Sequence, residues 1–308
     1  MRLSRTLALG ASLLVLLSAC GTGGGSSSPA KPTIKIGSVG FDEARVMAEI
    51  YAQVLEKAGY TVDRAGIGLG TRDVLLPALE SGQIDLQPEY IGSGLAAGYG
   101  GTSTNDPDAN RTELQKILDT KGGGITVLDY TPAQDTNALV VRKETAEQYS
   151  LATWGDLAAV QGDLKFGLAT DCPTNPLCAG ALKDSYGIDT TTVDLTLLDA
   201  CSTPMAEALK SGTIDVAELC STGPEIIVND WVRLEDDKAT QPADNIAPLV
   251  RNDFLAKTDK AAFSKLLNDV SAKIDTATLA QLYYDVAIDH KDIKDVATAW
   301  LKAQGIIS

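Results

Sequence analysis

The chain has few of the residues on which common catalytic sites depend. Aromatic side chains make up 5% of its 308 residues, and it has a single histidine, His290. It also lacks the GxSxG, HExxH and P-loop patterns of familiar hydrolases and nucleotide-binding enzymes. These absences argue against an enzyme, although a mechanism that uses carboxylates alone stays open. We expect no bound cofactor.

Positive charge is scarce as well. The sequence has 26 Lys and Arg against 41 Asp and Glu, which gives a net charge of −15. No basic stripe interrupts this acidic background, and such a surface repels nucleic acid and anionic lipid. Nucleic acid is therefore excluded as a partner.

The chain also lacks an apolar run of the roughly 20 residues needed to cross a membrane. Its longest run, Leu7 to Leu17, follows two arginines and leads into Leu-Ser-Ala-Cys20, which resembles a bacterial lipobox. We therefore expect a signal peptide over 1–19, lipid on Cys20 and a Gly/Ser-rich flexible tether over 20–31. This places the protein outside the cytoplasm, anchored to the membrane by lipid. An extracellular sensor module is an alternative class of protein, but its sequence would normally show a membrane-spanning helix that leads to a signalling domain.

Four cysteines remain, which in an exported protein suggests two disulfides with three possible connectivities. A structural zinc is the alternative, but no CxxC pair is present. Two apolar runs that end near Cys201 and Cys220 are joined by a helical segment, so they are expected to form parallel strands with adjacent ends. We therefore pair Cys201 with Cys220, and Cys172 with Cys178.

A sequence phrase recurs at an offset of 130 residues. Ala78 to Asp85 reads ALESGQID, and Ala208 to Asp215 reads ALKSGTID. Lys35-Ile36-Gly37 and Lys165-Phe166-Gly167 are separated by the same offset. Two matches at one offset indicate two similar α/β halves.

Strand-like and helix-like segments alternate along the chain, as in α/β folds. Extended segments on either side of the second half predict two crossings between lobes. We expect lobe I to comprise 32–136 plus 246–308, and lobe II to comprise 137–245.

Several of these segments resemble one protein family. The pieces Leu69 to Arg72, Pro77 to Asp85, Pro88 to Gly92 and Asn245 to Val250 are similar to substrate-binding proteins of ABC importers for glycine betaine, choline, carnitine and related osmoprotectants. The resemblance implies a type II periplasmic-binding fold, with two α/β lobes, two hinge strands and a cleft that closes around a small solute. It also implies a membrane permease as partner, and we expect a monomer.

The resemblance further implies an aromatic cage for a quaternary ammonium, a cation–π site. Tyr90 matches a cage tyrosine, and Ser93 matches a hydroxyl residue that contacts the solute's carboxylate. Asn137 stands where the family has a tyrosine in the first hinge strand, and Met205 and Cys220 stand at second-lobe tyrosines. Gln241 to Asp244 (QPAD) replaces an aromatic segment.

Other candidate ligand contacts come from positions at the ends of predicted strands, near the expected cleft. They are Asp42, Thr71, Arg72, Asp135, Asn137, Ser221 and Thr222, with Met205 as an apolar wall beside Tyr90. Because most cage aromatics are replaced by polar groups, an uncharged polar solute is the alternative to an osmoprotectant. An exported enzyme on the same fold is a further alternative.

Overall fold

The structure, a computed structural model, describes residues 31–308. The predicted signal peptide over 1–19, the lipidation site Cys20 and all of the 20–31 tether except Lys31 lie outside the described residues. Within 31–308, no helix is long and apolar enough to cross a membrane.

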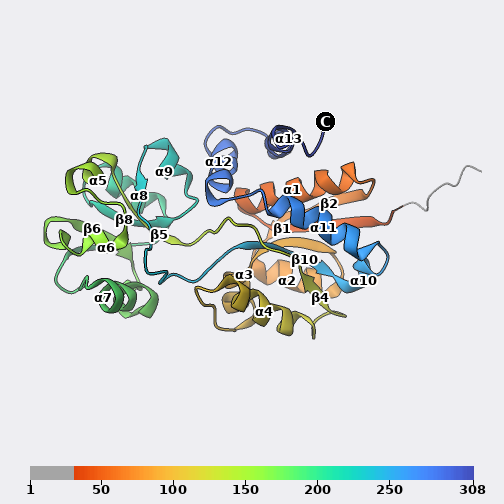
Figure 1. Cartoon of the computed structure of the whole chain (residues 1–308), viewed down its shortest axis with the longest axis horizontal. Coiled ribbons are helices and arrows are strands. Elements are labelled where there is room, and N and C mark those ends of the chain that lie inside the picture. The colour runs from red at the N-terminus through yellow and green to blue at the C-terminus, as the bar shows by residue number, and fades with distance from the viewer. Residues whose placement is uncertain (1–30) are drawn as a thin grey trace, which may run out of the picture. The chain divides into compact units, whose positions relative to one another are not determined.

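The strands of residues 31–308 form two five-stranded sheets (Figure 1). The first sheet has the order β2-β1-β3-β10-β4 and the second has the order β7-β6-β8-β5-β9. In each sheet a strand that follows a crossing runs antiparallel to its neighbours: β10 in the first and β5 in the second. The strands are β1 (Thr33–Val39), β2 (Thr61–Gly70), β3 (Leu86–Tyr90), β4 (Ile125–Val127), β5 (Asn137–Val141), β6 (Lys165–Ala169), β7 (Asp194–Leu198), β8 (Val216–Cys220), β9 (Val232–Arg233) and β10 (Ile246–Arg251).

Helices cover both faces of the first sheet, because its strands carry apolar side chains on both sides. One face packs on α1 and on the C-terminal helices, and the other packs on α2 and α4 (Figure 1). The helices of this lobe are α1 (Asp42–Lys57), α2 (Arg72–Ser81), α3 (Ile91–Ser93), α4 (Pro107–Leu118), α10 (Asn252–Leu255), α11 (Lys260–Ser271), α12 (Thr276–Ala287) and α13 (Ile293–Ala303).

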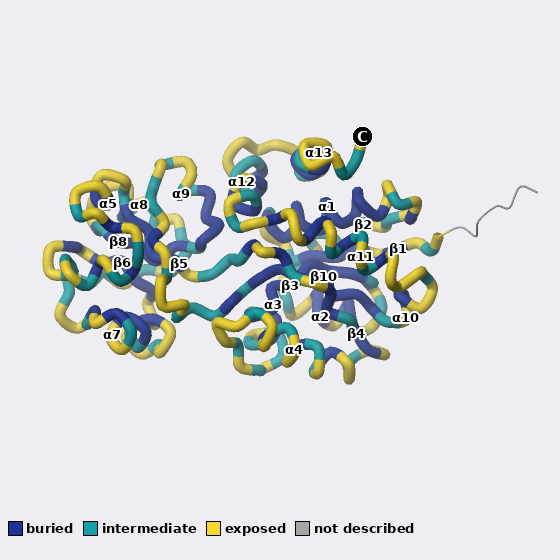
Figure 2. The backbone as a smooth tube through the Cα atoms, in the orientation of Figure 1, coloured by how far each residue is buried: buried dark blue, intermediate teal, exposed yellow. Residues whose placement is uncertain are grey.

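The second sheet is built in the same way, with one apolar cluster on each face. Trp154, Leu182 and the disulfide of Cys172 lie in one cluster, and Met205 and Leu209 lie in the other. Central strands such as β3, β10 and β8 are almost entirely buried, whereas the edge strands β2, β7 and β9 are partly exposed, as are the outer sides of the helices (Figure 2). The helices here are α5 (Lys143–Tyr149), α6 (Trp154–Leu157), α7 (Ala181–Tyr186), α8 (Thr203–Lys210) and α9 (Pro224–Val228).

The chain passes between the two sheets twice, over 128–136 and over 234–245. The two crossings pair with each other through a bridge between Gln134 and Asn245. The Asp135 N–H also donates to the carbonyl of Asp244 at 3.2 Å. The predicted arrangement of two α/β lobes joined by two crossing segments is therefore present.

The 130-residue repeat holds at the level of individual atoms. The Lys35 N–H donates to the Asp85 carboxylate at 2.9 Å, and the Lys165 N–H donates to the Asp215 carboxylate at 3.1 Å. A Cβ on Gly37 would lie 2.6 Å from Ile84 Cδ1, and one on Gly167 would lie 2.3 Å from Ile214 Cδ1. Each glycine therefore lets the isoleucine of the following strand–turn unit pack directly on the sheet.

Candidate functional site

Tyr90 ends β3, and its side chain turns toward the start of α1. Its hydroxyl donates a hydrogen bond to Oε1 of Glu43, which lies on the apolar stripe of α1 and is 1% exposed. The Phe41 ring lies 5.8 Å from the Tyr90 ring, centroid to centroid, and 45% of Phe41 is exposed. The predicted contact residue Tyr90 thus links a buried carboxyl to an exposed aromatic ring.

The first crossing and the second lobe also contribute to this cluster. The Thr222 hydroxyl, just beyond β8, donates to Oδ1 of Asp135 at 2.8 Å. Burial raises the pKa of Glu43, and the charge of Asp135 raises it further, so the two carboxyls lie close enough to interact. The structure thus brings together Tyr90, Asp135 and Thr222, three of the residues predicted from the sequence.

The second crossing reaches the same region through Asp244. The Ser93 N–H donates to Asp244 Oδ1 at 2.8 Å, and the Ser93 hydroxyl donates to Oδ2. Gly92 permits this approach, because a Cβ there would lie 2.5 Å from the carbonyl oxygen of Ala243. The Gly-Ser pair after Tyr90 is therefore the docking point for the second crossing. We call Glu43, Tyr90, Ser93, Asp135, Thr222 and Asp244 the Tyr90 cluster.

Removal from water dominates the electrostatics of the Tyr90 cluster. Burial raises the pKa of Glu43 to about 8, with the charge of Asp135 acting in the same direction. Burial also raises the pKa of Asp244 to about 6 and raises the pKa of Asp135. It likewise raises the pKa of Tyr90 well above its usual value, so this hydroxyl remains a hydrogen-bond donor.

Three other candidate ligand contacts from the sequence are Asp42, Thr71 and Arg72. The Arg72 guanidinium donates to the buried carboxylate of Glu89, with Nη2 2.9 Å from Oε1. Thr71 is exposed and precedes α2 without a side-chain cap. Asp42 is the first residue of α1 rather than its cap, and it pairs with Arg45 at 2.8 Å. The charged groups of Arg72 and Asp42 are therefore paired with neighbouring side chains, and their contact with a solute stays a prediction.

A cavity of about 570 Å³ lies along the two crossings. Asn137 and Ser221 are the predicted residues that line it. The Ser221 hydroxyl donates to the Gln134 carbonyl at 3.0 Å and accepts from the Thr136 N–H, so it ties the first crossing to β8. Most of the lining is polar: Asn105, Gln134, Thr136, Asn137, Ser221, Arg233, Glu235, Asp236, Gln241 and Thr276, with Ala138, Ala152, Trp154, Leu234 and Ala239.

Met205 lies elsewhere than the sequence analysis expected. It is fully buried in the apolar cluster between α8 and the second sheet, with Leu209 and Ile214. Its sulfur would be 2.8 Å from a Cβ on Gly167, so it fills the space that this glycine leaves. Met205 therefore belongs to the core of the second lobe and forms no wall beside Tyr90.

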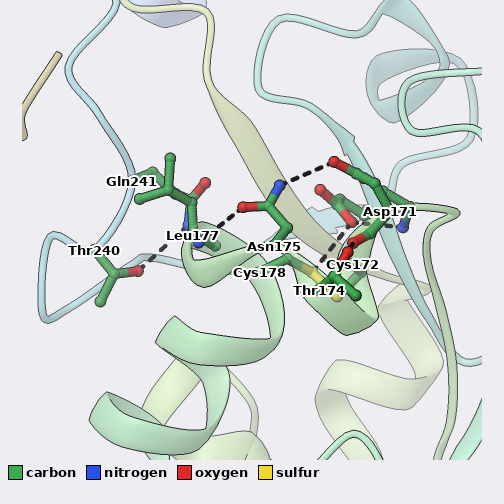
Figure 3. Close-up of a disulfide and its surroundings, with 10 residues drawn as sticks. Asp171, Cys172, Thr174, Asn175, Leu177, Cys178, Thr240 and Gln241 are labelled. Atoms are coloured by element: carbon green, nitrogen blue, oxygen red, sulfur yellow. Dashed lines mark hydrogen bonds between the residues drawn. A yellow bond between two sulfur atoms is a disulfide. The ribbon is translucent and has the colours of Figure 1, made fainter. Parts of the chain in front are cut away.

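Both disulfides expected from the sequence are present, Cys172–Cys178 and Cys201–Cys220. Figure 3 shows the first of them just beyond β6, in a loop closed by hydrogen bonds of Asn175. Gln241, from the second crossing, donates to the Leu177 carbonyl in this loop at 2.8 Å. The small disulfide loop is thus attached to the crossing that carries Asp244.

Sequence analysis missed Glu43 and Asp244. Glu43 lies on the same helical face as Met47, Ile50 and Val54, and a carboxylate on an apolar stripe is the signal that could have revealed it. Asp244 was noted only as part of the segment Gln241 to Asp244, because its hydrogen bonds depend on where the second crossing meets Ser93.

Comparison with known proteins identifies the family. The sequence model of the OpuAC family, described as the substrate-binding domain of ABC-type glycine betaine transport systems, matches residues 32–303. The chain belongs to this family. Its members are extracytoplasmic solute-binding proteins of ABC importers for glycine betaine and related osmoprotectants, which confirms the family predicted from the sequence.

Individual relatives extend over nearly the whole chain. The glycine betaine-binding protein YehZ of Escherichia coli K12 is 29% identical, over 97% of this chain and 98% of its own length. A glycine-betaine-binding protein of Pseudomonas aeruginosa is 27% identical, over 89% of each chain. The carnitine transport binding protein OpuCC of Listeria monocytogenes is 26% identical, over 83% of each chain.

Solved structures confirm the predicted type II periplasmic-binding fold. A glycine betaine/carnitine/choline ABC transporter structure aligns with a TM-score of 0.79 at 24% identity, covering 90% of this chain and 99% of the other. Apo YehZ from Escherichia coli aligns with a TM-score of 0.77 at 25% identity, covering 89% and 99%.

Proposed function

We propose that this family member captures a small osmoprotectant-class solute, such as glycine betaine, choline or carnitine, between its two lobes at the Tyr90 cluster. The solute would then pass to a membrane permease. One observation carries the assignment of the site. Glu43 and Tyr90 of the first lobe, Asp135 of the first crossing and Thr222 of the second lobe converge in one polar cluster.

The proposed division of the chain follows from the crossings. Lobe I comprises 32–136 plus 246–308, lobe II comprises 137–245, and the crossings act as hinges. Because the Tyr90 cluster takes residues from both lobes and both crossings, a bound solute would couple its own contacts to the interlobe angle. Such coupling lets a permease distinguish loaded from empty protein.

The proposed setting is the outer face of the cell membrane. A lipid on Cys20 would hold a monomer near its permease, with the 20–31 tether giving the domain freedom to dock. The acidic composition supports an extracytoplasmic binding protein that does not adhere to anionic lipid by charge. The relatives are transport binding proteins, which supports solute capture without catalysis.

Calorimetric titration of the purified protein with glycine betaine, choline and carnitine tests this function. At least one solute should bind with micromolar affinity, and Tyr90→Ala should abolish that binding. Tyr130→Phe is the control, because it removes a tyrosine hydroxyl bonded to Asp108, away from the Tyr90 cluster. Failure of all three solutes to bind, or unchanged affinity in Tyr90→Ala, would contradict the proposal.

An uncharged polar solute is the second candidate, and the cavity along the crossings favours it. The side-chain amides of Gln134, Asn137 and Gln241 and the hydroxyls of Thr136 and Ser221 line this cavity. Such groups form hydrogen bonds with a polyol or sugar without requiring charge. Titration with polyols and sugars, using Asn137→Ala as the diagnostic variant, separates this candidate from the first.

A further inference from the structure

The cavity along the two crossings and the Tyr90 cluster take alternate residues of the same segments. Along the first crossing, Gln134 and Thr136 line the cavity, whereas Asp135 between them belongs to the cluster. Just beyond β8, Ser221 lines the cavity, and Thr222 donates to Asp135 at 2.8 Å. Neighbouring residues of an extended chain point to opposite sides. The cavity therefore lies on the other side of the first crossing and can be occupied at the same time as the cluster.

Two side chains of opposite charge face this cavity without an ionic partner. Arg233 and Glu235 both line it, and the alternation of exposed Arg233, buried Leu234 and exposed Glu235 places the two charges on one side of the chain. Residues two apart on an extended segment are separated by roughly 7 Å. Among residues 31–308, neither side chain takes part in an ion pair. The cavity wall therefore presents one positive and one negative group for a ligand.

The guanidinium of Arg233 is held at the cavity wall with donors to spare. Its Nη1 donates to the carbonyl of Ser221 at 3.0 Å. Partial removal from water lowers the pKa of Arg233, and no carboxylate acts on it in the opposite direction. Arginine carries five N–H donors in a planar fork that matches the two oxygens of a carboxylate. Arg233 can therefore receive the carboxylate of a ligand.

A buried donor at the same wall lacks an acceptor. Trp154 lines the cavity and is 4% exposed, and its indole N–H has no hydrogen-bond partner among residues 31–308. A buried donor without an acceptor destabilises a protein, so a ligand oxygen that reaches it would be favourable. The backbone N–H of Trp154 donates to the carbonyl of Glu235 at 2.8 Å. The unsatisfied donor is thus attached to the segment that carries the two free charges.

Asp236, the other carboxylate in the lining, is already engaged. Its two oxygens accept from the Thr240 hydroxyl at 3.1 Å and from the Gln241 N–H at 2.8 Å. The free charges of the cavity are therefore those of Arg233 and Glu235, which balance. A simple anion would be repelled by Glu235 and a simple cation by Arg233, whereas a zwitterion meets each with the opposite sign.

We propose that the cavity along the crossings is a second binding site, which takes a small α-amino acid as its zwitterion. The carboxylate of the amino acid would bind Arg233 and its ammonium group would donate to Glu235. The side-chain amides of Gln134 and Asn137 remain for a polar side chain. This site is separate from the Tyr90 cluster, and its ligand carries N–H donors that a quaternary ammonium lacks.

Calorimetric titration of the purified protein with glycine, L-serine and L-glutamine tests this site. At least one of the three should bind with a Kd below about 1 mM. The methyl ester of that amino acid lacks the carboxylate and its N-acetyl derivative lacks the ammonium group, so each should bind at least roughly tenfold more weakly. Absence of binding by all three amino acids, or equal binding by either derivative, would overturn the inference. This comparison decides the ligand class without any variant.

Variants locate the bound amino acid. Arg233→Gln and Glu235→Gln should each weaken its binding by at least roughly tenfold. The matched controls Arg111→Gln and Glu147→Gln remove charges on α4 and α5 that do not line the cavity, and they should bind as the wild type does. Wild-type affinity in both Arg233→Gln and Glu235→Gln would overturn the assignment of the cavity.

Tyr90→Ala separates the two sites. It should keep the wild-type affinity for the amino acid, because Tyr90 does not line the cavity. Loss of amino acid binding in Tyr90→Ala would place the ligand at the Tyr90 cluster and overturn the inference. Failure of the proposed function is observed separately, as the absence of binding by glycine betaine, choline and carnitine.

Discussion

The hydroxyl of Tyr90 donates a hydrogen bond to the carboxyl of Glu43, a residue 47 positions earlier in the chain. This contact fixes the edge of β3 against the first turn of α1. It also joins a protonated phenol to a carboxyl whose pKa burial has raised to about 8. Because Glu43 lies in the proposed binding site, its protonation should make both the stability of the protein and its affinity for a solute depend on pH.

The free energy of unfolding should fall as pH rises through the range in which Glu43 is protonated in the folded protein but ionised in the unfolded chain. Its ordinary pKa is 4.5 and its folded pKa is about 8, so between these values the folded protein holds a proton that the unfolded chain has lost. The stabilisation that comes from the raised pKa of Glu43 is fully present below pH 4.5 and is lost as pH approaches 8. It amounts to about 1.4 kcal/mol for each unit by which the folded pKa exceeds the unfolded pKa. Denaturant unfolding without solute at pH 5 and pH 8.5 should show a smaller difference for Glu43→Gln than for the wild type. The control Glu113→Gln, on the exposed face of α4, should behave as the wild type; equal differences in all three proteins would contradict this.

Binding of an organic cation should release a proton below about pH 8, because the cation favours ionised Glu43. The affinity for choline should therefore rise with pH from 6 to 8, by up to roughly tenfold per unit for one proton. The titratable groups that act on Glu43 are Asp135, Tyr90 and Asp244. Glu43 in turn acts on Tyr283, together with Glu225, Asp42 and Asp135.

Calorimetry in two buffers of different ionisation enthalpy measures this proton directly. The observed binding enthalpy should depend on the buffer for the wild type at pH 7 and much less for Glu43→Gln. A wild-type enthalpy that is the same in both buffers would show that no proton leaves on binding.

The two disulfides should contribute unequally to stability. Cys201 and Cys220 are 19 residues apart, whereas Cys172 and Cys178 are 6 apart, and the longer loop restricts the unfolded chain more. Replacing both cysteines of a pair with serine should cost about 3 kcal/mol for the longer loop and about 2 kcal/mol for the shorter. Urea unfolding measures both values. Free thiols in the unreduced wild type would refute the pairings themselves.

Anchoring by Cys20 is a prediction from sequence. A Cys20→Ala variant expressed in its host should leave the membrane fraction, because it can no longer receive lipid. Membrane fractionation with an antibody against the protein measures this. Retention of the variant in the membrane would contradict the lipobox interpretation.

Local sequence predicted two similar α/β halves, and the family resemblance supplied the type II arrangement of the two lobes. The 130-residue offset predicted two similar halves, and Gly37, Gly167, Asp85 and Asp215 occupy equivalent positions in the two sheets. These features could be predicted because each depends on contacts within one strand–helix–strand unit, and the same sequence phrase builds the same unit twice. The cysteine pairing followed from the same reasoning.

Which residues make up the proposed binding site could be determined only from the tertiary structure. Tyr90 and Asp135 could be proposed from strand ends, but Glu43 and Asp244 join them only where α1 and the second crossing converge. Met205 was assigned to that site, yet the rotation of α8 directs it into the core. Sequence determines which face of a segment is apolar and where a strand ends, because those properties are local. The raised pKa of Glu43 and the use of both Ser93 donors by Asp244 depend on which distant residues meet and how far water is excluded, and only packing of the whole domain decides that.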